Sequence, residues 1–239
     1  ELVSKLPRNR RKLNISVFKI ILVLVLAIVI VGVGAGFGAL KGILDDTPNI
    51  NADALIPKGY KTTLVYQNGK EITTLANSNS NREYVYYDSI PEDLVNAFVA
   101  IEDRRFWEHN GIDVQGIARA FIKGLKSGDF DEGASTLTQQ LIKNNVFNVG
   151  LNESTFLDKL ERKVQEQYLA VDMEKKIDKK SIVEYYLNTI YLGEGCYRVE
   201  TAAKTYFGKW LSQLSVSECA VLAAIPQNPT KYDPLLSPD

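Results

Sequence analysis

SIPEDLVNAFVAIEDRRFWEHNG, residues 89–111, marks the point at which the apolar residues take up the spacing of a helix. Its first four residues, SIPE, have the spacing of a capping box with a proline in the first turn, so we expect a helix to begin here. The apolar face of that helix carries Leu94, Phe98 and Ile101.

Further apolar stripes with helical spacing follow, and the last one stops before Pro226. They fall at residues 114–125, 157–171, 183–190 and 217–224. No repeat or low-complexity tract interrupts them. We therefore expect residues 89–239 to form one mainly helical domain.

The residues before this domain do not have the apolar spacing of a helix. TTLVYQNGKEITTL, residues 62–75, alternates in polarity and breaks at Asn68-Gly69, which is a strong hairpin signal. EYVYY, residues 83–87, offers a third strand. We interpret residues 41–88 as a polar linker followed by a small antiparallel β region.

Residues 20–40 carry no charge, and a helix of this length spans the roughly 30 Å core of a bilayer. Residues 1–19 hold six basic residues and one acid, so the positive-inside rule predicts a cytoplasmic N-terminal tail and an extracytoplasmic remainder. A cleaved signal peptide is the alternative, but its apolar core would be shorter.

Composition excludes several classes of protein. With 239 residues, 45% of them apolar, the chain can bury a substantial core. Residues 20–239 hold 22 basic and 28 acidic residues, a net charge of −6, which does not suit nucleic-acid binding. Two cysteines are too few for a disulfide framework or a zinc site.

Glu102 and Asp103 follow the apolar face of the first helix directly. A carboxylate at the edge of a buried face is partly desolvated, which raises its pKa and suits it to act as a general base. The alternative is a solvated helix end with ordinary surface acids. We interpret His109, the only histidine, as structural rather than catalytic.

GASTLTQQLIKNN, residues 133–145, concentrates polar side chains at the start of another helix. Ser135 or Thr136 can cap that helix, and an ammonium and two amides then share one face with a hydroxyl. Such a face suits the binding of sugar hydroxyls and a phosphate. A capped, exposed helix whose polar face meets water would show the same sequence pattern. The face consists of Thr136, Gln139, Gln140 and Lys143, with Asn144 beside it.

Arg162 and Glu166 lie four residues apart, with Lys163 beside them. An ordinary surface ion pair is one interpretation. The other is that Glu166 is a second carboxylate of the site and that the two cations face an anionic leaving group.

The order of five motifs resembles the series found in peptidoglycan glycosyltransferases, glycosyltransferase family 51. These enzymes form the N-terminal catalytic domain of class A penicillin-binding proteins or stand alone as monofunctional transglycosylases. Five motifs in order are specific where any one would be weak, and the resemblance covers roughly residues 60–239. The motifs are EDRRFWEHNG, GASTLTQQLIKN, RKVQE, EYYLNTIYLG with AAKTYFGK, and LAAIPQNPTKYDP.

This resemblance implies a lysozyme-like helical fold with a hydrophobic jaw on the bacterial membrane. It implies an inverting reaction in which the 4-hydroxyl of an acceptor N-acetylglucosamine, on lipid II, attacks the anomeric carbon of a lipid-pyrophosphate-linked glycan chain. The implied partners are lipid II, that lipid-linked chain, the membrane and other cell-wall synthesis proteins, with no nucleic acid.

The resemblance also implies roles for individual residues. Glu102 corresponds to the general base, and Glu166 to the second glutamate near the pyrophosphate and a divalent cation, Mg²⁺ or Mn²⁺. No organic cofactor is implied. The implied contacts to the donor and its pyrophosphate are Ser135, Gln139, Lys143, Arg162 and Lys163, with Thr136, Gln140 and Asn144 shaping the wall.

The chain departs from the family pattern in three places. Arg198 stands where we expect a glycine, and if φ is positive there, arginine costs about 1 kcal/mol. No basic residue lies between Asn144 and Lys159, where family members often carry one. The sequence stops at Asp239, soon after the fifth motif, so we expect no transpeptidase domain within it.

Two alternative functions fit the same fold. One is a catalytically impaired membrane scaffold that binds lipid-linked precursors, for which Arg198 is the best argument. The other is a lytic hydrolase with two carboxylates. Lys143, Arg162 and Lys163 favour a transferase over a hydrolase, since a hydrolase never meets a pyrophosphate.

Overall fold

A computed structural model describes residues 8–57, 62–65, 71–75, 84–127, 133–147 and 155–236. The chain divides into two compact units, residues 1–48 and 49–239. In the first unit, α1 (Arg8–Asp45) contains a stretch, Val17–Asp45, that is long and apolar enough to cross a membrane. The helix extends beyond both ends of the predicted span because lysine and leucine are good helix formers whether or not they face lipid.

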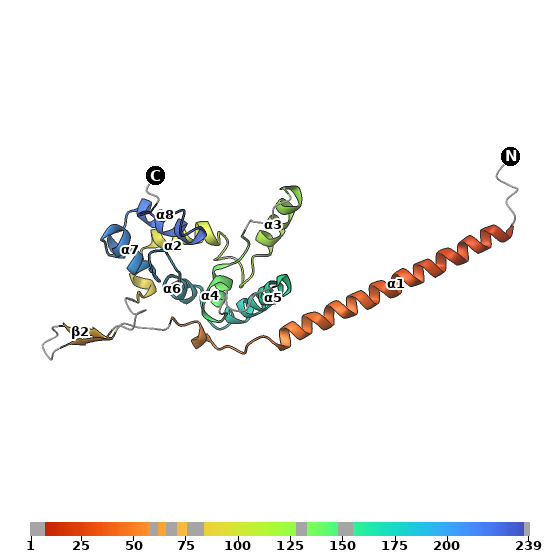
Figure 1. Ribbon diagram of the computed structural model, residues 1–239, viewed down its shortest axis with the longest axis horizontal. Coiled ribbons are helices and arrows are strands. Elements are labelled where there is room, and N and C mark those ends of the chain that lie inside the picture. The colour runs from red at the N-terminus through yellow and green to blue at the C-terminus, as the bar shows by residue number, and fades with distance from the viewer. Residues whose placement is uncertain are drawn as a thin grey trace. The chain divides into compact units, whose positions relative to one another are not determined.

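The second unit is mainly helical, as predicted (Figure 1). Helix α8 packs on α2, and α4 packs against both α5 and α6. The buried core between them includes Phe98 and Tyr186, whose rings meet edge to face with centroids 6.0 Å apart. The helices are α2 (Glu92–Glu102), α3 (Val114–Ser127), α4 (Leu137–Asn145), α5 (Phe156–Met173), α6 (Lys179–Leu187), α7 (Val199–Phe207) and α8 (Val216–Ala224). The 3₁₀ helices are η2 (Ala52–Ala54), η3 (Tyr87–Ser89), η4 (Leu211–Gln213) and η5 (Ile225–Gln227).

The two strands of the predicted hairpin are present and pair with each other. Strands β1 (Thr62–Val65) and β2 (Glu71–Leu75) pair in antiparallel register, with Thr62 opposite Leu75 and a shift between Leu64 and Val65. The predicted Asn68-Gly69 turn lies outside the described residues.

The prediction of a third strand at EYVYY is wrong for Tyr84–Tyr87, because residues 84–86 form no strand and η3 begins at Tyr87. Helix α6 provides the reason. The Asn188 side chain, just after α6, accepts from the Val85 N–H (2.9 Å) and donates to the Val85 carbonyl (2.7 Å), and Glu184 accepts from the Tyr87 N–H (2.7 Å). Side chains thus take the place of a neighbouring strand.

The predicted capping box at SIPE is also wrong. Ser89 belongs to η3, and Pro91 itself is the N-cap of α2, with no side chain capping the helix. The Leu94 and Val95 N–H groups instead donate to the Pro91 carbonyl (3.0 and 3.2 Å). The fixed φ of proline starts the helix without a side-chain acceptor.

Not every apolar stripe lies in the core. Phe98 of α2 is buried, but α3 exposes Val114, Phe121, Ile122 and Leu125, with Phe121 57% accessible. The buried residues of α3 are the glycines Gly116 and Gly124. Apolar residues at helical spacing therefore predict an apolar helix face, but they do not predict which part of the protein covers that face.

Arg198 has a φ of +128° and a ψ of 145°, a combination that glycine adopts readily and other residues rarely do. The backbone is held there by two hydrogen bonds, from its N–H to the Ile190 carbonyl (3.0 Å) and from the Ala202 N–H to its carbonyl (3.1 Å). Its side chain is buried, with the guanidinium 6.0 Å from the ring centroid of Tyr84. The positive φ anticipated from the family's glycine is confirmed.

Comparing Arg198→Gly with Arg198→Ala should isolate this backbone strain, because both variants remove the buried guanidinium and differ only in Cβ. We expect the glycine variant to be the more stable of the two by about 1–2 kcal/mol, despite the greater freedom of glycine in the unfolded chain. Urea unfolding of the two variants measures the difference. Equal stability, or a more stable alanine variant, would show that this backbone carries no strain.

Candidate active site

A cavity of about 1780 Å³ lies among the end of α2, the α4 and α5 helices and the segments that follow α6 and α8. It exceeds the roughly 300–1,000 Å³ of common small-molecule pockets, so it suits an extended ligand. Nine of the ten residues predicted for the site line it: Glu102, Ser135, Gln139, Gln140, Lys143, Asn144, Arg162, Lys163 and Glu166.

Thr136, the tenth, stands behind the wall as the N-cap of α4. Its Oγ1 accepts from the Gln139 N–H (3.2 Å), while Gln139 Oε1 accepts from the Thr136 N–H (3.3 Å), which completes a capping box. The Thr136 hydroxyl donates to the Gly111 carbonyl (2.8 Å). This box fixes the amide of Gln139, whose buried Nε2 has no hydrogen-bond partner within the described residues.

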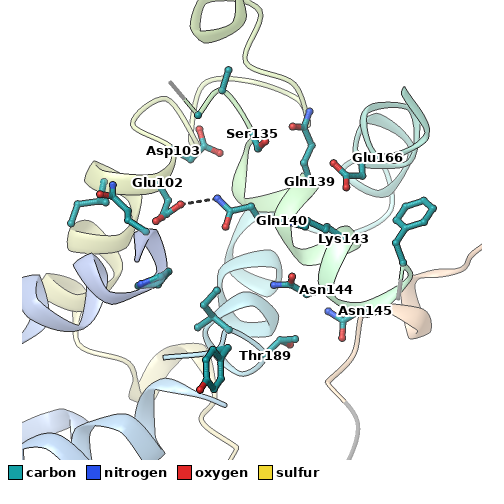
Figure 2. Close-up of a pocket in the computed structure, with 18 of the residues that line it drawn as sticks. Glu102, Asp103, Ser135, Gln139, Gln140, Lys143, Asn144, Asn145, Glu166 and Thr189 are labelled. Carbon is teal, nitrogen blue, oxygen red and sulfur yellow. Dashed lines mark hydrogen bonds between the residues drawn. The ribbon is translucent and has the colours of Figure 1, made fainter. Parts of the chain in front are cut away.

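Glu102 ends α2 at the edge of the cavity (Figure 2). Its Oε2 accepts a hydrogen bond from Gln140 Nε2 (2.8 Å), and its buried Oε1 makes none to the described part of the chain. Burial raises the pKa of the Glu102 carboxyl, the Gln140 hydrogen bond lowers it, and the charge of Asp103 raises it, with a net increase. The predicted desolvation of this carboxylate is confirmed.

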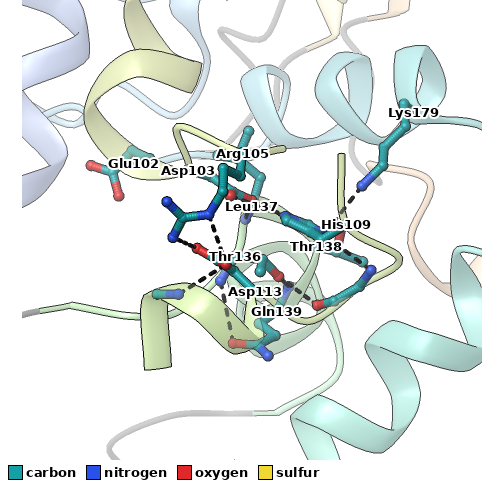
Figure 3. A network of polar contacts seen from close by, with 12 residues as sticks. Glu102, Asp103, Arg105, His109, Asp113, Thr136, Leu137, Thr138, Gln139 and Lys179 are labelled. Atoms are coloured by element: carbon teal, nitrogen blue, oxygen red, sulfur yellow. Dashed lines mark hydrogen bonds and ion pairs between the residues drawn. The ribbon is translucent and has the colours of Figure 1, made fainter. Parts of the chain in front are cut away.

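Asp103, next to Glu102, also lines the cavity, and its buried carboxylate belongs to a polar network (Figure 3). Its carboxylate accepts from His109 Nε2 (2.9 Å) and from the Leu137 N–H (2.9 Å) at the first turn of α4. His109 Nδ1 accepts from the Gly111 N–H (3.2 Å). His109 therefore makes hydrogen bonds to neighbouring segments, as its structural interpretation predicts, and Asp103 ties the end of α2 to the start of α4.

Glu166 lies on α5 and is fully buried, with 0% of its side chain accessible. Its two carboxylate oxygens pair with different cations, Oε1 with Arg162 and Oε2 with Lys163 Nζ (3.0 Å). Lys163 Nζ also donates to Ser135 Oγ. The interpretation as an ordinary surface pair is wrong, because α5 turns this carboxylate toward α4 rather than toward water.

Basic side chains outnumber acidic ones in the cavity lining by seven to four, a net charge of +3. Sequence reasoning missed four of the basic residues. The position of Lys159, one turn before Arg162 and Lys163 on α5, is a spacing that could have revealed it. The signal for the other three was weaker, because they lie outside the polar helix faces. The four residues are Arg104, Arg105, Arg119 and Lys159.

Glu102 and Glu166 stand on opposite sides of the polar face of α4, with Gln139 and Gln140 between them (Figure 2). One wall thus carries a carboxylate of raised pKa with an oxygen that lacks a hydrogen bond to the described residues, and the other carries paired cations. Such an arrangement can remove a proton at one side of a ligand and stabilise negative charge at the other.

A mainly helical domain with a carboxyl group of raised pKa on one wall of a large cationic cavity suits glycosyl transfer. The sequence profile of a family described as Transglycosylase matches residues 68–239. The chain belongs to this family and is an enzyme domain of the transglycosylase type.

Curated relatives support the assignment. The chain is 44% identical to penicillin-binding protein 1A of Clostridium novyi (strain NT) over 82% of its own length and 23% of the relative's. It is 51% identical to penicillin-binding protein 1A of Aquifex aeolicus (strain VF5), over 66% of the chain and 21% of the relative. Penicillin-binding protein 1F of Bacillus subtilis (strain 168) is 43% identical over 74% of the chain and 23% of the relative. The chain spans about a quarter or less of these relatives.

Proposed function

We propose that this domain polymerises lipid II into glycan strands. The acceptor's 4-hydroxyl attacks the anomeric carbon of the lipid-linked donor, Glu102 takes the hydroxyl proton, and the bond from that carbon to the diphosphate breaks with inversion. The observation that carries the proposal is the placement of Glu102 across the cavity from Glu166, which is paired with Arg162 and Lys163. Attack from the face opposite the leaving group requires such a separation.

The cationic wall supports the departure of a diphosphate. Arg162 and Lys163 together exceed the charge of Glu166 by one, and Lys143 adds a further cation with no ion pair in the described structure. Groups held in place before the reaction stabilise a leaving anion without reorganisation. Lys159 lines the same cavity and offers the basic residue that the segment after Asn144 lacks.

Two apolar surfaces fit a substrate that stays in a membrane. Helix α1 can serve as the anchor of the domain in the bacterial cell membrane, with the N-terminus in the cytoplasm. The exposed face of α3 can serve as the hydrophobic jaw, since apolar side chains this exposed favour a lipid interface. Other cell-wall synthesis proteins remain expected partners.

The test is to incubate the chain in detergent with labelled lipid II and resolve the products by size. We expect glycan polymer that a muramidase shortens. Lipid II binding without polymer would instead support the alternative function, a catalytically impaired membrane scaffold. The observation that favours this alternative is the strained backbone at Arg198. Cleavage of preformed glycan strands without polymerisation would support the hydrolase.

We also propose that a divalent cation, where required, is held jointly with the donor diphosphate. Both oxygens of Glu166 already accept from side-chain cations, and the described ranges contain no group of three or more His, Cys, Asp or Glu residues placed to hold a metal. We expect a chelator to raise the KM for lipid II while the Tm of the substrate-free chain stays unchanged. A lower Tm on chelation would indicate a resident ion instead.

A further inference from the structure

We infer that Tyr186 is a positioning residue for the proposed reaction, holding the Gln140 amide so that its N–H fixes the Glu102 carboxylate. This inference rests on the proposed function, in which Glu102 is the base. It concerns a residue of α6 that does not line the cavity and acts only through another side chain.

Three helices contribute one residue each to a chain of hydrogen bonds. The Tyr186 hydroxyl donates to Gln140 Oε1 (3.2 Å), and Gln140 Nε2 donates to Glu102 Oε2 (2.8 Å). Tyr186 is 1% accessible, and the Phe98 ring packs edge-on against it. The phenol therefore has little freedom to move away from Gln140.

The direction of each hydrogen bond follows from the chemistry of the groups. An ionised carboxylate only accepts, so the Gln140 amide must present its nitrogen to Glu102 and its oxygen to Tyr186. The phenol then has to donate, which requires its neutral form. Burial and the charge of Glu102 both raise the pKa of Tyr186 well above its ordinary value, which keeps the phenol protonated.

This orientation leaves the two oxygens of Glu102 in different surroundings. Gln140 fixes the position of Oε2, while the buried Oε1 makes no hydrogen bond to the described residues. Without the Tyr186 hydroxyl, the amide loses the partner that selects its orientation. A rotated amide would direct its oxygen at the carboxylate and repel it.

Loss of the hydrogen bond that Gln140 donates to Glu102 should shift the pH dependence of polymerisation in a defined direction. The hydrogen bond favours the ionised carboxylate, so its loss raises the pKa of Glu102 further. A general base works only when deprotonated, so the acid limb of the profile shifts to higher pH. The titratable groups that interact with the charge of Glu102 are Asp103, which follows it after α2, and Tyr186 on α6. Other charged or titratable groups from the packed elements share the cavity lining with Glu102: Arg104 and Arg105 after α2, Lys143 on α4, and Tyr191 and Tyr197 after α6.

The experiment compares the pH dependence of lipid II polymerisation by the parent chain and by Tyr186→Phe. We expect the acid-limb midpoint of the variant to lie about one pH unit higher, with turnover on that limb lower by about tenfold. Gln140→Leu should give the same shift, and the double variant no additional one, because both residues act through one hydrogen bond. Additive shifts, or an unchanged midpoint in Tyr186→Phe, would overturn the inference.

Tyr206→Phe is the matched control. Its hydroxyl donates to the Leu192 carbonyl (2.7 Å) away from the cavity lining, so this variant loses a comparable hydrogen bond and should keep the parent midpoint. An equal shift in the control would also overturn the inference.

If the parent forms no polymer, the proposed function fails but the inference can still be tested. Titration of ¹³C-labelled glutamate carboxyls by NMR, with Glu102→Gln to assign the signal, reports the pKa of Glu102 without turnover. A higher pKa in Tyr186→Phe would support the positioning role, and an unchanged one would refute it.

Discussion

Glu102→Gln is expected to abolish glycan polymerisation, with a loss of turnover of at least about 100-fold. The amide keeps the shape of the side chain and can still bind Gln140, but it cannot take a proton from the acceptor hydroxyl. Polymer yield from labelled lipid II, measured at several enzyme concentrations, gives the rate. Near-normal turnover by this variant would reject Glu102 as the base.

The same substitution should leave the free energy of unfolding unchanged or slightly increased at neutral pH. Burial raises the pKa of Glu102, so the fold disfavours its ionised form, and that penalty grows as pH rises from the unfolded-state pKa to the folded-state pKa. A neutral amide does not carry this penalty. Glu92→Gln, at the exposed start of the same helix, is the control and should retain full turnover.

Glu166→Ala is expected to lower both turnover and stability. Removing the carboxylate removes the ion pairs that orient Arg162 and Lys163, and we therefore expect turnover to fall by about 100-fold. The free energy of unfolding should fall by about 1–3 kcal/mol. The loss is smaller than for a fully buried pair, because the side chains of Arg162 and Lys163 are 17% and 38% accessible and can regain water.

Asp172→Ala is the matched control for this prediction. Asp172 lies on the same helix and pairs with Lys176 at 2.6 Å, four residues later, but on the exposed surface. Such pairs contribute little, so we expect the control to stay within about 0.5 kcal/mol of the parent and to polymerise normally. Glu166→Ala with the stability and turnover of Asp172→Ala would show that the buried triad has no role in the site.

Much of the site could be predicted because the motifs carry short-range information. The spacing of Gln139, Gln140 and Lys143 on one helix predicted a shared polar face, and the three residues do line one cavity. The position of Glu102 at the end of an apolar face predicted its desolvation. Both follow from helix geometry over a few residues, which the local sequence dictates.

Other features required contacts between distant segments. Val85 lies 103 residues before Asn188 in the chain, and their mutual hydrogen bonds replaced the predicted third strand. Tyr186 and Gln140 are 46 residues apart, and no local pattern joins them. Hydrogen-bond partners at such separations depend on how the helices pack, which helical spacing does not specify.

The amino-acid pattern alone established a mainly helical transglycosylase-family domain after one long apolar helix, because periodicity and ordered motifs depend on neighbouring residues. Tertiary packing decided which apolar stripes lie in the core and which carboxylates are buried. The stripes of α2 and α3 share one periodicity, yet Phe98 is buried and Phe121 is exposed. The reason is physical: an apolar face gains by leaving water, but only the arrangement of the other helices supplies something to cover it.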